Sequence, residues 1–159
     1  MGWVGMLSGP KGLMAITLPQ AAEADAFYHL GERAGDAELS ERAFAGLVGR
    51  LRDYFRGDQV DFPEQLDLSG VTAFRSRVYR ACSLIKYGET RSYGWIAEQL
   101  KQPGAARAVG QALGRNPLPI IVPCHRVIAG GGGLGGFTGG LDTKQRLLNM
   151  EAGSLRLKG

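Results

Sequence analysis

A break in hydrophobic periodicity between residues 58 and 73 divides the chain into two parts of opposite net charge. This segment carries Asp, Pro, Gly and Ser without a repeating apolar pattern. Residues 1–70 hold 6 Lys and Arg against 11 Asp and Glu, a net charge of −5, whereas residues 71–159 hold 13 against 4, a net charge of +9. A chain of 159 residues is long enough for two small packed units. We therefore predict one domain over residues 1–69 and a second over residues 70–159.

The N-terminal part has the pattern of a small α/β domain. Two apolar runs, Trp3–Leu7 and Leu13–Leu18, flank a Gly- and Pro-containing turn, which predicts a hairpin. Between Leu39 and Phe55 the apolar residues recur at three- and four-residue spacing, and Gly57 follows. This spacing predicts an amphipathic helix over residues 39–55 that ends near the glycine.

The C-terminal part is predicted to be mainly helical and to contain a helix-turn-helix. Apolar stripes indicate helices over Phe74–Lys86, Ser92–Leu100 and Ala105–Arg115, with a Pro-Gly break at residues 101–104 between the last two. Two short helices joined by a tight glycine-containing turn have the spacing of a helix-turn-helix. Cys82 lies on the apolar face of the first helix, where we expect it to fill the core.

The polar face of the helix over residues 105–115 favours an anionic partner, with nucleic acid first. Arg107, Gln111 and Arg115 recur at four-residue steps, with Gly110 and Gly114 beside them. Glycine inside a helix costs about 1 kcal/mol relative to alanine, so two glycines indicate that something approaches the backbone closely. The alternatives are a solvated helix pair whose glycines serve packing and a merely basic surface.

The segment from Asn116 to Ile128 is the most specific part of the chain. Its apolar, proline-punctuated run predicts a buried extended segment that ends in Cys124-His125. A cysteine attacks as its thiolate, which needs a nearby base or positive charge at neutral pH. Neighbours on an extended segment point to opposite sides, so we expect a water to bridge the thiol and the imidazole.

A glycine-rich loop and a last helix follow the cysteine. Residues 130–136 include six glycines, whose unobstructed amides suit close approach to a planar ligand or, alternatively, a flexible linker. Asp142 is the expected N-cap of a helix over Thr143–Glu151. Glu151 falls on its apolar side, where a carboxylate needs a partner such as His125, unless the helix end is frayed and solvated.

These motifs resemble those of the O6-alkylguanine-DNA alkyltransferases, also called methylated-DNA–protein-cysteine methyltransferases. The resemblance covers nearly all of residues 70–153, and the N-terminal part is less specific. It rests on Ser92-Tyr93-Gly94, Ala105-Ala106-Arg107-Ala108-Val109-Gly110, Asn116-Pro117, Pro123-Cys124-His125-Arg126-Val127, Gly139-Gly140 and Leu147-Leu148-x-x-Glu151.

The resemblance implies a role for each matching residue in the reaction. Cys124 would accept the alkyl group, and His125 would take its proton through a water while Glu151 orients the imidazole. Tyr93 would hydrogen-bond the flipped guanine, and Arg107 would fill the space that the base leaves. Substrate contacts would come from Leu113, Asn116, Val127, Phe137 and Thr138. DNA contacts in the minor groove would come from Ala105, Ala106, Gly110, Gln111, Gly114 and Arg115.

The implied function is stoichiometric repair of O6-alkylguanine in double-stranded DNA by a monomer without cofactor, metal or membrane contact. The lack of a signal-peptide pattern predicts a cytoplasmic protein. At Phe137 the family more often has tyrosine, so one hydroxyl contact is missing. The alternatives are a base-flipping relative that lacks the acceptor cysteine, a helix-turn-helix regulator, and a cysteine hydrolase.

Overall fold

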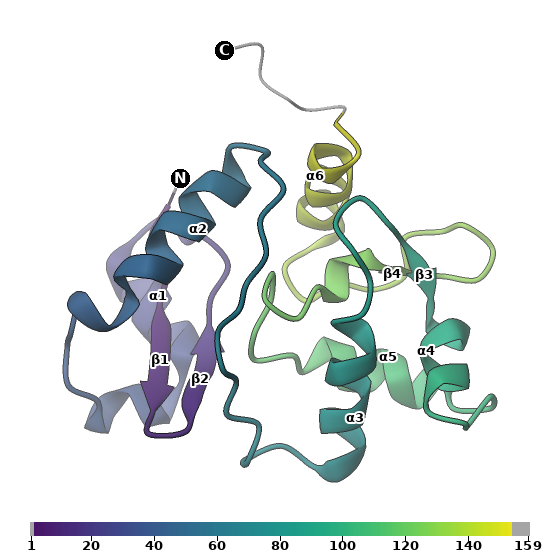
Figure 1. The fold of residues 1–159 in the computed structure, drawn as a ribbon, viewed down its shortest axis with the longest axis horizontal. Helices are drawn as coiled ribbons and strands as arrows, with labels where there is room; N and C mark the ends of the chain where they lie inside the picture. The colour runs from purple at the N-terminus through teal and green to yellow at the C-terminus, as the bar shows by residue number, and fades with distance from the viewer. Residues whose placement is uncertain (1, 154–159) are drawn as a thin grey trace. The chain divides into compact units, whose positions relative to one another are not determined.

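The computed structural model describes residues 2–153, and the chain divides into two compact units, Met1–Leu68 and Ser69–Gly159 (Figure 1). Each unit combines helices with a two-stranded sheet, so the fold is mixed α/β. Among the residues described, no helix is long and apolar enough to cross a membrane.

An antiparallel hairpin begins the first unit, as the alternation of apolar runs and turn residues predicts. Strand β1 spans Met6–Gly9 and β2 spans Gly12–Ile16, both shorter than the apolar runs. Gly12 has a φ of +133°, and a Cβ at this position would lie 2.3 Å from the backbone oxygen of Gln65. The turn therefore requires glycine, because a side chain would collide with the returning chain.

The helix expected over residues 39–55 begins only at Ala45, so its predicted N-terminal part is wrong. Leu39 is 82% exposed and does not lie on the buried face. The apolar spacing that suggested a longer helix thus includes residues that contact solvent, while Leu47, Leu51 and Tyr54 are buried. The helices of this unit are α1 (Glu23–Leu30), η1 (Glu32–Asp36), η2 (Arg42–Phe44) and α2 (Ala45–Phe55).

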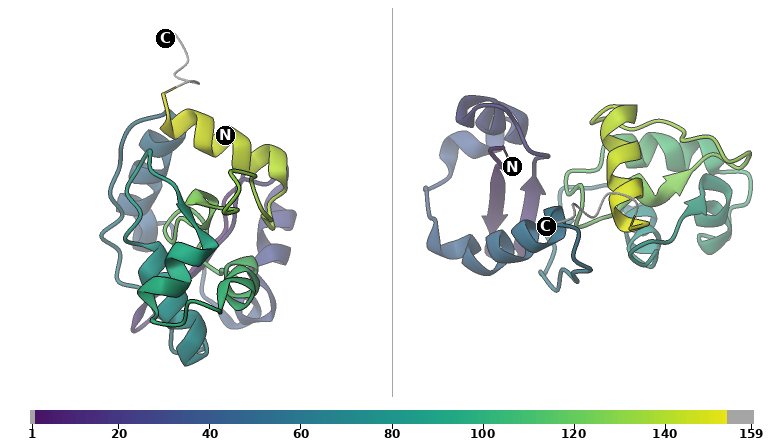
Figure 2. Two further views of the ribbon diagram at one scale, coloured as in Figure 1. Left: turned by 90° about the vertical axis from the view of Figure 1, so that its right-hand side faces the viewer. Right: turned by 90° about the horizontal axis from the view of Figure 1, so that it is seen from above.

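The second unit is built around three helices and a final helix that contacts the cysteine segment. Helix α5 packs against both α3 and α4, and α6 lies beside η3 (Figure 2). The short strands β3 and β4 pair in parallel. The elements are α3 (Ala73–Cys82), β3 (Arg91–Ser92), α4 (Tyr93–Gln99), α5 (Ala106–Gly114), η3 (Cys124–Arg126), β4 (Val127–Ile128) and α6 (Leu141–Glu151).

Side-chain caps begin two of these helices. The hydroxyl of Thr72 accepts a hydrogen bond from the amide of Arg75 at 3.3 Å, and Ser92 accepts one from Trp95 at 3.0 Å. Such caps satisfy amides that have no partner within the helix. Helix α3 ends at Cys82, four residues before the predicted end. Cys82 is fully buried, as predicted.

The segment before Cys124 is buried, as predicted, but it is not extended. Ile120 has a φ of +73°, and residues 124–126 form a 3₁₀ turn. Three prolines between residues 117 and 123 lack amide donors and cannot form a continuous ladder. The prediction that Cys124 and His125 alternate across a strand is therefore wrong.

The start of the last helix also differs from the prediction. Helix α6 begins at Leu141, and Gly140, with a φ of +92°, occupies the N-cap position. Asp142 lies in the first turn instead of capping it. Its carboxylate there still interacts favourably with the positive end of the helix dipole.

Candidate active site

An open pocket of about 990 Å³ lies in the second unit, lined by α5, the start of α4 and the glycine-rich loop. Cys124 forms part of its wall and is 8% exposed. The pocket thus gives the thiol limited access to solvent. Of the residues expected in the site, it brings together Tyr93, Ala106, Arg107, Gly110, Gln111, Leu113, Gly114, Cys124, Phe137 and Thr138.

Asn116 fixes the turn that presents Cys124. Its side-chain amide donates to the carbonyl of Val122 at 2.9 Å, and its side-chain oxygen accepts from the amide of Leu118 at 2.9 Å. Burial raises the pKa of the Cys124 thiol, while a hydrogen bond from Asn116 and the charge of Lys144 act in the opposite direction. Burial therefore keeps the thiol protonated at neutral pH, while Asn116 and Lys144 would stabilise the thiolate once it forms.

His125 and Glu151 form a buried hydrogen-bonded pair behind the cysteine. Nε2 of His125 lies 2.7 Å from Oε1 of Glu151, and their side chains are 0% and 1% exposed. Burial lowers the pKa of His125, and the neighbouring carboxylate opposes that effect. Burial raises the pKa of Glu151, but hydrogen bonds from His125 and Arg126 outweigh it and bring the pKa to about 2. The carboxylate is thus ionised at neutral pH.

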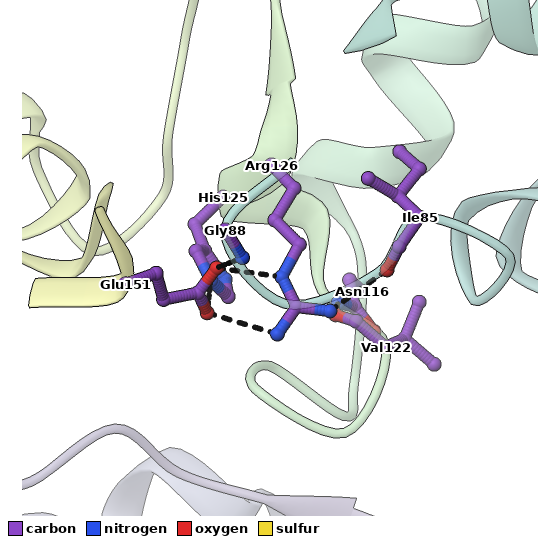
Figure 3. Close-up of polar contacts among 7 residues, drawn as sticks. All are labelled: Ile85, Gly88, Asn116, Val122, His125, Arg126 and Glu151. Atoms are coloured by element: carbon purple, nitrogen blue, oxygen red, sulfur yellow. Dashed lines mark hydrogen bonds and ion pairs between the residues drawn. The ribbon is translucent and has the colours of Figure 1, made fainter. Parts of the chain in front are cut away.

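Arg126 binds the same carboxylate through both of its oxygens (Figure 3). Its Nε donates to Oε2 of Glu151 at 2.8 Å, and its Nη2 donates to Oε1 at 2.9 Å. Its Nη1 donates to the carbonyl of Ile85 at 2.8 Å, and the amide of Gly88 donates to Oε2 of Glu151 at 3.2 Å. A charged group this deeply buried is stable only with such a set of partners.

The far wall of the pocket is held by weaker contacts with backbone groups. The Tyr93 hydroxyl lies 3.4 Å from the carbonyl of Gly136, and the Thr138 hydroxyl donates to the carbonyl of Gly114 at 2.8 Å. Gly135 has a φ of +70°, and a Cβ there would lie 2.5 Å from the Tyr93 hydroxyl oxygen. The loop therefore requires glycine where it passes the tyrosine ring.

The polar face of α5 is exposed beside this pocket. Arg107, Gln111, Gly114 and Arg115 are exposed, and Ala105 is the N-cap of the helix. Val127 does not line the pocket but lies fully buried in β4. Within residues 2–153 no group of three or more His, Cys, Asp or Glu side chains is placed to hold a metal ion.

Comparisons with known proteins agree on one family. The profile described as the 6-O-methylguanine DNA methyltransferase DNA-binding domain matches residues 73–153. The methylated-DNA–protein-cysteine methyltransferase of Mycolicibacterium paratuberculosis is 59% identical over 110 residues, which are 69% of this chain and 66% of that protein. The chain belongs to the 6-O-methylguanine DNA methyltransferase family.

Solved structures of family members resemble both units of the chain. The Mycobacterium tuberculosis OGT in complex with DNA has a TM-score of 0.75 at 40% identity, covering 95% of this chain and 93% of that one. The O6-methylguanine-DNA methyltransferase of Pyrococcus kodakaraensis has a TM-score of 0.62 at 30% identity, covering 94% and 90%. The family likeness therefore includes the N-terminal unit, where the sequence motifs are least specific.

Two buried basic residues at the site, Arg126 and Lys144, are not predicted from the sequence. Arg126 stands directly after His125 and binds Glu151, for which the sequence suggests only His125 as a partner. Lys144 is fully buried, and its Nζ donates to the carbonyls of Val127 at 2.5 Å and Gly136 at 3.1 Å. Its position three residues before the buried Leu147, on the same helix face, was the available signal.

Proposed function

We propose that the protein repairs double-stranded DNA by moving an alkyl group from O6 of guanine to Sγ of Cys124, and that each molecule reacts once. The observation that carries the proposal is the placement of Cys124 in the pocket wall, directly before the buried His125–Glu151 pair with its 2.7 Å contact. A thiol in an open pocket, next to a histidine held by a carboxylate, has the parts of an activated nucleophile.

The proposed reaction is a displacement at the alkyl carbon. With Glu151 ionised, the Nε2–H of His125 donates to the carboxylate, which leaves the basic lone pair on Nδ1. His125 takes the Cys124 proton through a bridging water, and the thiolate forms a bond to the alkyl carbon. The carbon–O6 bond breaks, its electron pair goes to the oxygen, and the guanine anion is then protonated. The thioether has no group that water attacks readily, so the protein is consumed.

We propose that α4 and α5 act as a helix-turn-helix that docks in the minor groove. Arg107 is exposed on α5 at the mouth of the pocket, a position from which it can enter the base stack when guanine leaves. Gly110 and Gly114, with Gln111 beside them, line the same pocket and allow close approach of a DNA strand. Ala105, Ala106 and Arg115 at the two ends of α5 would contact the sugar-phosphate backbone.

The flipped base would lie between α5 and the glycine-rich loop. Leu113 and Phe137 offer apolar surface there, and Tyr93 and Thr138 offer hydroxyl groups. A backbone group of Cys124, which lines the pocket, would read the base edge, whereas Val127 is buried outside the pocket and would not contact the base. We propose that the two units are separate domains, 1–69 and 70–159, of a cytoplasmic monomer in which Cys82 and Cys124 remain free thiols, as they are in the structure.

Intact-mass spectrometry after incubation with an O6-methylguanine duplex tests the proposal. We expect one added methyl group on the wild type and on Cys82→Ala, but none on Cys124→Ala. Cys124→Ala should retain duplex affinity, because the thiol lies in the pocket and not on the phosphate-facing surface. Duplex binding without any adduct on the wild type would indicate a recognition protein, and ester or amide turnover without adduct would indicate a hydrolase. A methyl group on Cys124→Ala would place the acceptor elsewhere.

A further inference from the structure

The guanidinium of Arg126 contacts the same carboxylate that binds His125. Its Nε and Nη2 meet the two oxygens of Glu151 at 2.8 and 2.9 Å (Figure 3). The same oxygen that accepts from Nη2 lies 2.7 Å from Nε2 of His125. One carboxylate is therefore shared between a permanent cation and a titratable ring.

The contact between Arg126 and Glu151 involves two hydrogen bonds and therefore fixes the orientation of the carboxylate. A two-point contact between a guanidinium and a carboxylate fixes the plane of the carboxylate as well as its position. The third nitrogen, Nη1, is anchored by the carbonyl of Ile85 at 2.8 Å, just after α3. The ring of Tyr87 lies 5.8 Å from the guanidinium carbon. Arg126 thus joins the end of α3 to the last residue of α6 around Glu151.

We propose that Arg126 is a positioning residue that holds Glu151 ionised and in plane while sharing its negative charge, so that His125 stays a neutral base. The inference rests on the proposed alkyl transfer, in which a neutral imidazole takes the thiol proton. Without the arginine, the full charge of Glu151 would face the imidazole and favour the imidazolium, which cannot act as a base.

The charges around His125 act in the directions this role requires. Burial lowers the pKa of His125, Glu151 opposes this effect, and the charges of Arg126 and Lys144 add to it. Glu151 and Lys144 come from α6, whereas Arg126 and Cys124 come from the same short turn as the histidine. Loss of the Arg126 charge therefore raises the pKa of His125, and loss of Glu151 lowers it.

The test measures His125 directly, without requiring alkyl transfer. Imidazole resonances of the wild type, Arg126→Gln and Arg126→Lys are followed by NMR against pH, with the exposed His29 on α1 as an internal reference. We expect the His125 titration to move to higher pH in Arg126→Gln and to stay near the wild type in Arg126→Lys, which keeps the charge.

A kinetic measurement adds the functional consequence. Single-turnover transfer to methylated duplex should show a ratio of the rate at about pH 8 to that at about pH 6 that is roughly threefold larger in Arg126→Gln than in the wild type. Arg126→Lys should lose rate by a similar factor at both pH values, because one ammonium cannot hold the carboxylate plane.

Arg77→Met is the matched control. The Nη2 of Arg77 also donates to a backbone carbonyl, that of Leu100 at 2.7 Å, but within residues 2–153 its guanidinium binds no carboxylate. It should leave the His125 titration unchanged.

Identical titration of His125 in folded Arg126→Gln and the wild type overturns the proposal. If Arg126→Gln does not fold, a wild-type-like titration in Arg126→Lys supports the proposal and a shift to higher pH overturns it. Absence of a methyl adduct on the wild type would instead defeat the proposed function while leaving the titration result intact.

Discussion

The residues on the two sides of Cys124 differ in burial and in the contacts that hold them. Behind the thiol, His125, Arg126 and Glu151 are buried and joined by charged contacts of 2.7 to 2.9 Å. In front of it, the pocket is lined by exposed α5 residues and a glycine-rich loop whose tyrosine contact is 3.4 Å long. The site thus combines a buried assembly of hydrogen-bonded charged groups behind the thiol with an open pocket in front of it. Substitutions behind the cysteine should affect stability and reaction together, and those in front should affect substrate handling alone.

Removal of the buried carboxylate should have the largest effect. Glu151→Ala leaves the guanidinium of Arg126 buried without its counterion, and breaking such a pair typically costs about 3 to 5 kcal/mol. Urea denaturation should show this loss in the free energy of unfolding, and transfer to methylated duplex should be almost abolished. Glu98→Ala, on the exposed face of α4, is the control and should change stability by less than about 0.5 kcal/mol. Near-wild-type stability of Glu151→Ala would mean that the buried groups behind the thiol do not stabilise the fold.

The free energy of unfolding should fall at acid pH because Glu151 becomes protonated. The pKa of Glu151 in the folded state is about 2, below that of an unfolded glutamate at about 4.3. The stabilisation it provides is therefore complete above the unfolded pKa and is lost as the pH falls from about 5 towards about 2. The free energy of unfolding of Glu151→Gln should depend less steeply on pH over this window than that of the wild type. Parallel curves for the two proteins would contradict the assignment.

On the open side, Arg107→Ala should separate duplex repair from chemistry. The arginine is needed only when a base must leave the stack, so repair of duplex should slow by about tenfold or more, which corresponds to about 1.4 kcal/mol. Reaction with free O6-benzylguanine should change little, and so should stability. Gln111→Ala, one turn further along the same helix face, offers a comparison without the positive charge. Equal losses on both substrates would place Arg107 in the chemistry or the fold.

The smallest effects should come from the pocket wall at Phe137. Restoring the hydroxyl in Phe137→Tyr adds at most one hydrogen bond, worth about 0.5 to 1.5 kcal/mol, so single-turnover transfer should be unchanged or about 2- to 10-fold faster. Phe137→Ala removes the apolar surface and should be slower than the wild type. Rates are compared at saturating duplex, where binding no longer contributes. Transfer by Phe137→Ala at the wild-type rate would show that the ring does not hold the base.

Local patterns in the sequence were sufficient for most of the fold. Apolar spacing located α4 and α5, and the turn glycines located the hairpin, because helix and turn preferences act over a few residues. The same spacing extended the helix before Ala45 too far, since an apolar residue such as Leu39 can recur in register and still face solvent. The spacing of apolar residues shows which residues share a helix face, but not whether another part of the protein packs against that face.

The sequence by itself was sufficient to propose Cys124 as the acceptor and His125 as its base, because Pro-Cys-His-Arg is contiguous and a cysteine beside a histidine is a candidate nucleophile. It also indicated that Glu151 needs a buried partner. Only the tertiary structure decided how that charge is balanced. Arg126 and Gly88 reach the carboxylate from segments 25 and 63 residues away, and Lys144 reaches the carbonyl of Val127 from 17 residues away. Contacts at such separations depend on how the helices and turns pack, and neither local preference nor residue spacing specifies them.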